Sequence, residues 1–439
     1  MRQGLAQPGR LARAARADKQ ERLAGKAKGA QIHSGHISGQ NAHGQYTMVF
    51  RSRRAPQAPR PRARRLSGML APLHSGRLVC TLPLSKPAMR TVRRMLALAL
   101  VAPAALAAQR PTTAADVQRI LAPLADDSMA GRRTASPGEA RAARVIAAEM
   151  ERLGLKPMGD SGWFQRVPLA AAPLAAPRRG RTERLLLVQS FAERDTFPAE
   201  RRRTAVNVVG LLEGRDPQLK SEYVLITAHF DHVGIGAAVN GDSIYNGADD
   251  DASGVTTVLE IARQLAERPA PRRSVLFALW TGEEMGMLGT RWFIEHPVVP
   301  FGQIVANMEI EMIGRADSLA GGAGKAWLTG FERSNMGEQL AAAGIPIVAD
   351  KRPEQNFFER SDNIALARRG VVAHTLSTFN LHGDYHRPSD DMRGMDLEHM
   401  AAVINAAARA TRILADGPKP AWKPGGQPGG QPAARAPRP

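Results

Sequence analysis

The sequence predicts an α/β protein with a mostly parallel central sheet that is flanked by helices. From residue 185 onward, short apolar runs alternate with segments of helical periodicity, which is the pattern of βαβ units. Two runs, residues 223–228 and 275–280, are largely apolar along their whole length, as in strands that are buried on both faces. His, Asp or Glu follows each of several predicted strands. In open α/β sheets, a functional site lies beyond the carboxyl ends of the strands.

Periodicity predicts the position of each main element. The expected helices cover residues 113–124, 138–153, 253–267, 287–296 and 396–415. The expected strands cover residues 185–188, 206–212, 223–228, 275–280, 304–310 and 371–376. Gly154 ends the second helix as its C-cap, and Pro157 prevents the helix from resuming. Residues 170–182 are rich in Ala, Pro and Arg, and we expect a loop there.

The formal net charge of +19 is concentrated in the leading part of the chain. Residues 1–88 carry 17 Lys and Arg against two acidic residues, whereas 40 basic residues face 39 acidic ones from Met95 onward. The body of the protein is therefore nearly neutral, so its basic residues give no reason to expect a nucleic-acid partner. The single cysteine, Cys80, lies in the leading part. The body therefore has neither a disulfide framework nor a cysteine metal site.

Residues 89–108 have the layout of a secretory signal peptide. A basic segment at residues 89–94 precedes an apolar run, and Ala-Leu-Ala at residues 105–107 fits a cleavage site. The apolar run of about 14 residues is too short to span a membrane comfortably, and no cysteine follows it for lipidation, so we expect no stable membrane anchor. A buried or membrane-proximal helix is the alternative. We expect export, through a signal peptide starting at Met89, to the periplasm or the medium.

The remaining boundaries follow from composition. We expect translation to begin at Met89, so that residues 1–88 are a disordered basic stretch outside the native protein; a genuine disordered arm is the alternative. Residues 109–415 are expected to form one folded domain. Residues 416–439 repeat Pro-Gly-Gly-Gln, and we expect a flexible tail there.

Metal-binding residue types gather where the predicted strands end. The segments involved contain His229 and Asp231, residues 249–251, Glu283 and Glu284, Glu311, and His386 and Asp390. Each segment alone has an ordinary interpretation, such as a loop histidine, a helix N-cap or a solvated turn. Their coincidence at one sheet edge favours a metal site, because imidazole with carboxylate suits zinc and several carboxylates suit two ions. A phosphate-binding glycine loop and a serine-hydrolase elbow are both absent.

Five motifs in order resemble those of the co-catalytic di-zinc aminopeptidases, a superfamily that also contains glutamate carboxypeptidase and glutaminyl cyclase. They are Ala-His-Phe-Asp-His at 228–232, Gly-Ala-Asp-Asp-Asp-Ala-Ser-Gly at 247–254, Thr-Gly-Glu-Glu-Met-Gly at 281–286, Glu-Met-Ile-Gly-Arg at 311–315 and Tyr-His-Arg-Pro-Ser-Asp at 385–390. The resemblance covers roughly residues 120–412. It implies a phosphorylase/hydrolase-like zinc exopeptidase fold, two zinc ions per chain and a peptide substrate with a free N-terminus.

The same resemblance implies a role for each motif residue. The two zinc sites would be formed by His229 with Glu311 and by Glu284 with His386. Asp250 would bridge both ions, with a cis peptide to Asp251. Glu283 would be the general acid/base, and would pass a proton from water to the leaving amine. Asp231 would orient His229, and Asp390 would do the same for His386.

Two positions depart from the family pattern. The position of Glu311 is often Asp in the family, and Glu309 on the same strand face is a rival ligand. Residues 361–363, Ser-Asp-Asn, stand where many relatives have Ser-Asp-His. Alternatives to a secreted aminopeptidase are a carboxypeptidase or dipeptidase of the same superfamily and, less favoured, a glutaminyl cyclase or a zinc-less binding protein on the same fold.

Overall fold

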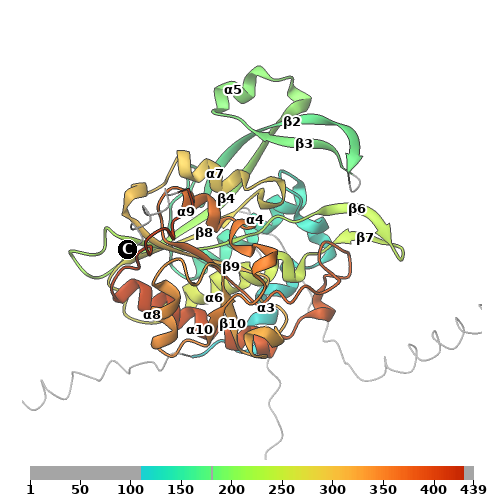
Figure 1. The fold of residues 1–439 in the computed structure, drawn as a ribbon. Coiled ribbons are helices and arrows are strands. Elements are labelled where there is room, and N and C mark those ends of the chain that lie inside the picture. Colours follow the sequence, from blue (N-terminus) through green and yellow to red (C-terminus); the bar gives the residue numbers. More distant parts are fainter. Residues whose placement is uncertain (1–109, 179–180, 430–439) are drawn as a thin grey trace, which may run out of the picture. The chain divides into compact units, whose positions relative to one another are not determined.

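The structure is a computed structural model that describes residues 110–178 and 181–429. These residues form a mixed ten-stranded sheet with helices on both faces, and a separate two-stranded hairpin (Figure 1). The large sheet contains β1 (Lys156–Pro157), β2 (Phe164–Arg178), β3 (Arg181–Leu187), β4 (Arg202–Leu212), β5 (Tyr223–His229), β8 (Ser274–Trp280), β9 (Ile304–Glu311), β10 (Ala326–Leu328), β11 (Ile347–Ala349) and β12 (Ala373–Ser377). The hairpin consists of β6 (Gly234–Val239) and β7 (Asp242–Tyr245).

Eight α-helices of the described residues surround the sheet. They are α3 (Ala114–Leu124), α4 (Pro137–Arg152), α5 (Phe191–Thr196), α6 (Gly254–Ala266), α7 (Leu288–Glu295), α8 (Met336–Ala342), α9 (Asn363–Arg368) and α10 (Leu397–Asp416). The longer helices lie close to their predicted positions. In α4, for example, the Ser136 side chain accepts a hydrogen bond from the Glu139 amide, and Pro137 occupies the first turn, where no backbone donor is needed.

Four neighbouring strands at the centre of the sheet are parallel, and the strands that flank them on either side run in the opposite direction. The strand order is β11-β10-β12-β9-β5-β8-β4-β2-β3, with β1 beside β4. β12, β9, β5 and β8 run parallel to one another, whereas β10 and β4, which flank this group, are antiparallel to their inner neighbours. The α/β fold class with a mixed central sheet is therefore confirmed. The carboxyl ends of the four parallel strands meet at one edge, which is where the sequence places the site.

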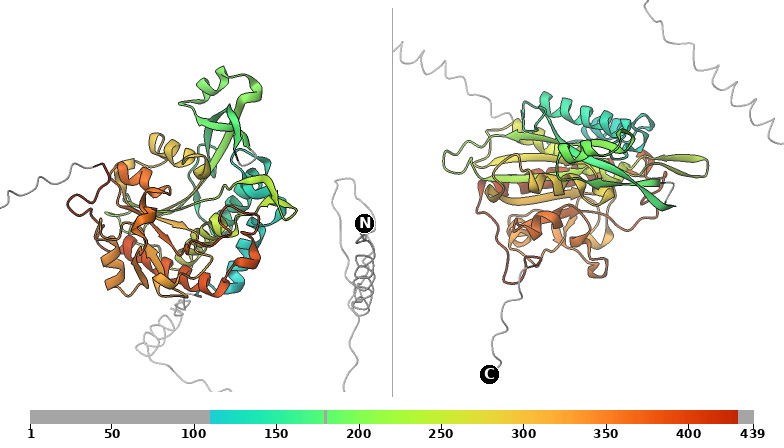
Figure 2. Two further views of the ribbon diagram at one scale, coloured as in Figure 1. Left: turned by 45° about the vertical axis from the view of Figure 1, so that its right-hand side comes forward. Right: turned by 90° about the horizontal axis from the view of Figure 1, so that it is seen from above.

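Alternate residues of the central strands form two separate cores. On β5, Val224 and Ile226 belong to a cluster that includes side chains of α3, α4, α6 and α10. Leu225 belongs to a second cluster with side chains of α7 and α9. Since successive strand residues point to opposite faces, the two clusters show that both faces are covered. The right-hand view of Figure 2 shows the cyan helices α3 and α4 along one side of the sheet.

The expected loop at residues 170–182 is wrong. The long strand β2 and the start of β3 cover most of it, and Figure 1 shows both strands extending away from the rest of the sheet with α5. The small side chains of Ala170 and Ala171 are buried there, and Pro173 is exposed. The Ala/Pro composition misled the prediction, because alanines fill a tight layer and an exposed proline is tolerated in a strand that leaves the sheet.

Part of the expected flexible tail is ordered against the body. Asn335 and Ala421 exchange hydrogen bonds of 3.1 and 2.8 Å, and the Trp422 indole N–H donates to the Gly370 carbonyl at 3.0 Å. Trp422 also lies against the rings of Phe358 and His374. The prediction for residues 416–439 therefore fails for this stretch, because the single tryptophan in it provides an apolar anchor.

The predicted signal peptide and the basic stretch before it lie outside the described residues. Within residues 110–178 and 181–429, we find no helix with the length and apolar character that crossing a membrane requires.

Candidate metal centre and active site

The predicted site residues come together at the carboxyl edge of the parallel strands. His229 is the last residue of β5, and Glu311 is the last residue of β9. Glu283 and Glu284 follow β8 in a short 3-10 turn. Asp250 lies in the turn Ala248–Ser253 that leads into α6, and His386 lies in the loop between β12 and α10. Elements far apart in the sequence therefore supply one site.

Four of these side chains are linked by close contacts between their polar atoms. The carboxylate of Asp250 lies 3.2 Å from His229 Nε2 through Oδ1 and 3.1 Å from His386 Nε2 through Oδ2. His386 Nε2 is also 2.8 Å from Glu284 Oε1. Asp250 thus stands between the two histidines, as a bridging ligand requires. The peptide bond from Asp250 to Asp251 is cis, as expected.

His232 also joins this cluster, although it was not among the predicted ligands. Its Nδ1 lies 3.0 Å from Glu284 Oε1 and 3.7 Å from Asp250 Oδ2. The sequence signal was present, because His232 belongs to the same motif as His229. Carried over residue by residue, the resemblance assigned it no role.

The donor atoms fit a bound metal. Among the described residues, His229 Nε2, Asp250 Oδ2 and Glu284 Oε1 are buried without a hydrogen-bond partner. Buried polar atoms in folded proteins nearly always have partners, so such a group of atoms indicates a missing one. Carboxylate oxygens and imidazole nitrogens are the ligands that zinc takes in enzymes. The site therefore suits zinc by its ligand chemistry.

Burial and the neighbouring imidazoles shift the pKa of Asp250 in opposite directions. Burial alone would raise its pKa, but the imidazoles of His232, His229 and His386 outweigh this effect and hold its pKa well below the ordinary value. The ionised carboxylate is therefore the stable form, which is the form that binds a cation.

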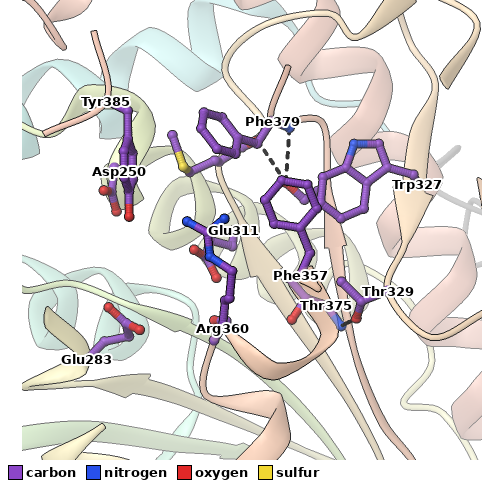
Figure 3. A pocket seen from close by; sticks show the side chains of 13 residues that line it. Asp250, Glu283, Glu311, Trp327, Thr329, Phe357, Arg360, Thr375, Phe379 and Tyr385 are labelled. Atoms are coloured by element: carbon purple, nitrogen blue, oxygen red, sulfur yellow. Dashed lines mark hydrogen bonds between the residues drawn. The ribbon is translucent and has the colours of Figure 1, made fainter. Parts of the chain in front are cut away.

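Glu283 and Glu311 lie at the pocket beside this cluster. Figure 3 shows the side chains of Asp250, Glu283 and Glu311 around the same open space. Burial, together with neighbouring carboxylates, raises the pKa of Glu283 well above its ordinary value, against the opposing charge of His229. A raised pKa makes a carboxyl group a better proton acceptor, as a group that takes a proton from water requires.

The rival ligand Glu309 is placed differently from Glu311. Glu309 is fully buried in β9, and the hydroxyl of Thr227 on β5 donates a hydrogen bond to its carboxylate. It does not line the pocket, whereas Glu311 does. The geometry therefore favours Glu311 as the ligand of the pair.

Asp231 and Asp390, which were expected to orient His229 and His386, use their carboxylates for other contacts. The backbone carbonyl of Asp231 lies 3.1 Å from His229 Nδ1, whereas its carboxylate lies 3.8 Å from that atom. The carboxylate instead accepts hydrogen bonds from the Glu283 amide and the Thr134 hydroxyl. The carboxylate of Asp390 accepts from the amides of residues 249 and 250, at 3.0 and 3.1 Å. Both aspartates therefore hold the backbone of the site segments.

A buried arginine holds the backbone of the segments that carry the site residues. The sequence did not predict this role. Arg132 is 1% exposed, and its guanidinium donates to the carbonyls of Phe230, Asn246 and Gly247, at 2.8, 2.5 and 2.8 Å. It thereby joins the loop after β5 to the segment that precedes Asp250. Its signal in the sequence is weak, because nothing about an isolated arginine in a turn indicates burial.

The departure at residues 361–363 lies in the pocket wall. Ser361 lines the pocket, and Asp362 is buried behind it, where the Thr290 hydroxyl donates to it at 2.6 Å. Burial raises the pKa of Asp362 to about 7. Asn363 accepts a hydrogen bond from the Thr375 hydroxyl at 2.9 Å and donates to the Phe358 carbonyl. It therefore braces the wall instead of facing the substrate.

The rest of the pocket combines aromatic, hydroxyl and cationic side chains. Its aromatic members are Trp327, Phe357, Phe379 and Tyr385 (Figure 3). The Trp327 and Phe357 rings stack with centroids 5.1 Å apart, and the Arg360 guanidinium lies 5.0 Å from the centre of the Phe357 ring. A peptide side chain that entered this space would meet apolar ring faces close to the carboxylates.

Comparison with known proteins relates part of the chain to a peptidase family. Residues 207–411 match the model of peptidase family M28. The chain carries an M28 peptidase domain. The matched segment contains all the predicted M28 site residues, from His229 to Asp390, together with His232.

Relatives of the M28 domain include peptidases of different size. A probable leucine aminopeptidase 2 from Aspergillus oryzae is 26% identical over 233 residues, which cover 47% of this chain and 44% of that protein. A vacuolar membrane protease from Sclerotinia sclerotiorum is 26% identical over 215 residues, which cover 48% of this chain and 18% of that protein. The chain therefore spans less than half the length of these curated relatives.

A solved structure shares the M28 fold described above. BSAP, a zinc aminopeptidase from Bacillus subtilis, is similar with a TM-score of 0.50 and 15% sequence identity, over 70% of this chain and 96% of that chain. At this level of identity, the similarity establishes the fold.

Proposed function

We propose that the chain is a zinc-dependent aminopeptidase that hydrolyses N-terminal residues from peptides. The observation that carries the proposal is the position of Asp250 between His229 and His386, with Glu283 at the adjoining pocket. His229 and Glu311 would hold one zinc ion, Glu284 and His386 the other, and Asp250 both. When bound, two such ions polarise a scissile carbonyl and make a water molecule more acidic.

The chain's own residues supply the remaining chemistry. Glu283 takes the proton of the attacking water, and it passes this proton to the leaving amine as the C–N bond breaks. The aromatic wall binds the side chain of the terminal residue and excludes water from it. Acidic side chains near the pocket favour a substrate with a positively charged free amine.

A second candidate is a carboxypeptidase or dipeptidase of the same superfamily. Arg360 is a cation in the pocket wall, and a guanidinium recognises a carboxylate through paired hydrogen bonds. A free C-terminus could therefore be the group that the pocket selects. Glutaminyl cyclase activity and a binding role without zinc are less favoured, because candidate ligands for two ions and Glu283 are all present.

A panel of short peptides with free or blocked ends tests the proposal. We expect zinc-dependent cleavage of peptides with a free N-terminus, whether or not the C-terminus is amidated, and no cleavage after N-acetylation. Cleavage of N-acetylated peptides that requires a free C-terminus would establish a carboxypeptidase, and a requirement for both ends a dipeptidase. The Glu283→Gln protein is the control for contaminating peptidases. Absence of zinc-dependent hydrolysis across the panel would refute the enzymatic assignment.

We propose further that the protein is exported, with residues 89–108 as its signal peptide. N-terminal sequencing of the native protein should find a start just after residue 107 or 108. Peptides from residues 1–88 in mass spectra of the native protein would contradict the proposed translation start at Met89.

A further inference from the structure

We infer that His232 is a fourth protein ligand of the metal site formed by Glu284, His386 and Asp250. The inference rests on the proposed metallopeptidase function, and it goes beyond that function by making the two metal sites unequal. One site would be closed by four protein ligands. The other, at His229, Asp250 and Glu311, would keep a position open for water and substrate.

The spacing of the four donor atoms supports this arrangement. His232, Asp250, Glu284 and His386 each offer one ligand atom, and these atoms all lie within 4.8 Å of one another. His232 Nδ1 is 3.0 Å from Glu284 Oε1 and 3.7 Å from Asp250 Oδ2. Neighbouring ligands of a tetrahedral zinc ion lie about 3.3 Å apart when each bond is about 2.0 Å. The measured distances fall around this value.

The imidazole of His232 is held in place and has no other partner. The residue is fully buried, and neither Nδ1 nor Nε2 has a hydrogen-bond partner among the described residues. Its backbone amide donates to the Arg132 carbonyl at 3.2 Å. Gly247 lies directly against the ring, since a Cβ at Gly247 would stand 2.6 Å from His232 Cδ2. A buried imidazole that is fixed in position and aimed at two carboxylates has the features of a ligand.

The pocket is lined by one ligand that belongs to the His229 site alone and by the ligand that both sites share. Glu311 lines it together with Glu283 and with Asp250, which both sites share, whereas His229, His232, Glu284 and His386 are not among its described lining residues. Catalytic zinc sites keep an open coordination position, and structural zinc sites are filled by four protein ligands. With three protein ligands, the His229 site would be the one that keeps this position for water and substrate. Zinc at the closed site should bind more tightly, and zinc at the open site should exchange first.

Zinc titration of metal-free full-length protein against a coloured chelator tests the inference. Wild type should bind two zinc ions with separable affinities. His232→Ala should weaken the tighter step by more than the roughly 100-fold typical of residues that only orient a ligand, and leave the weaker step in place. His229→Ala should affect the weaker step instead, and His296→Ala, outside the site, should affect neither. Unchanged affinities in folded His232→Ala protein would overturn the inference.

A measurement on the wild-type protein covers the case in which His232→Ala fails to fold. With one equivalent of Co²⁺ bound, X-ray absorption should count two imidazole ligands, from His232 and His386. A count of one would mean that His232 does not bind the ion, and the inference would be wrong.

The experiments distinguish a failure of the proposed function from a failure of the role inferred for His232. If wild type bound no zinc, or hydrolysed peptides equally well without it, the proposed function and the inference would fall together. If wild type bound two zinc ions and only the role of His232 failed, the proposed function would stand.

Discussion

The carboxylate of Asp231 accepts a hydrogen bond from the backbone amide of Glu283, with 3.0 Å between oxygen and nitrogen. Its second oxygen accepts from the Thr134 hydroxyl at 2.8 Å. The same residue contacts His229 through its backbone carbonyl, at 3.1 Å from Nδ1. Asp231 therefore joins the ends of β5 and β8, and it fixes the segment that carries the proposed acid/base residue.

Substitutions of Asp231 distinguish the role of its side-chain carboxylate from that of its backbone carbonyl. Asp231→Asn keeps an acceptor for the Glu283 amide, so we expect kcat to fall by only about 10-fold. Asp231→Ala removes that acceptor, and we expect a loss of about 100-fold. Both proteins should retain zinc, because the carbonyl beside His229 remains. Zinc content and kcat/KM are the measurements. Equal losses in the two variants would show that the charge of Asp231 matters more than its hydrogen bond.

Glu283→Gln should retain zinc and lose nearly all turnover. The amide has the size of the carboxyl group but cannot take up the proton of water, and general acid/base residues contribute about 10²- to 10⁴-fold to rates. Peptide hydrolysis and zinc content, measured on the same sample, give the result. Glu309→Gln is the matched control, since that glutamate is a buried residue of β9 that lies outside the pocket. Near-wild-type turnover in folded Glu283→Gln protein would refute the assigned role.

The parts of the fold that follow from strong periodicity could be predicted, and the weaker signals could not. The buried strands 223–228 and 275–280 are apolar on both faces, and their ends locate the site without any knowledge of the packing. The strand β2 was missed because its alanines and prolines carry no β signal, although pairing with β3 and β4 makes it a strand. The secondary structure of that segment is therefore determined by its pairing with neighbouring strands.

The site residues also differ in how well the sequence alone could predict their roles. Glu283, Asp250 and His386 could be proposed because each stands in a motif that follows a predicted strand or precedes a predicted helix. His232 stands in the same motif as His229, but its role, like that of Arg132, depends on the direction in which the side chain leaves the backbone. Only the three-dimensional arrangement shows that His232 Nδ1 lies beside Glu284, and that Arg132 donates hydrogen bonds to four carbonyls.

Removal of the Trp422 side chain should destabilise the domain. Trp422 is half-buried and lies against Phe358 and His374, whose chain neighbours Phe357 and Thr375 line the pocket. We expect Trp422→Ala to lower the free energy of unfolding by about 2 kcal/mol, below the 3–5 kcal/mol typical of a fully buried ring. Trp422→Phe should cost about 1 kcal/mol through the lost bond to Gly370. Urea unfolding measures both. An unchanged midpoint in Trp422→Ala would show that the ordered tail contributes nothing to stability.

The stability of the domain should depend on pH through His374. Its Nδ1 lies 2.7 Å from the Thr329 carbonyl and its Nε2 lies 2.7 Å from the Ser334 hydroxyl, so the buried imidazole fits its neutral form. Burial lowers the pKa of His374 to about 4. In the unfolded chain the pKa of histidine is about 6.5, so between these values the unfolded state binds the proton first. The stabilisation is therefore complete above about pH 6.5 and is lost as the pH falls towards 4.

A comparison with His374→Gln isolates this contribution. At pH 7.5 the variant should be less stable than wild type, because it lacks the neutral imidazole between Thr329 and Ser334. As the pH falls from 6.5 to 4, wild type alone should lose about 3 kcal/mol by this route, so the difference between the two proteins should narrow or reverse. Thr411→Ala, a buried change without a titrating group on α10, should give a difference from wild type that stays constant with pH. Urea unfolding at several pH values measures all three proteins. A pH-independent difference for His374→Gln would contradict the burial of a neutral imidazole at this position.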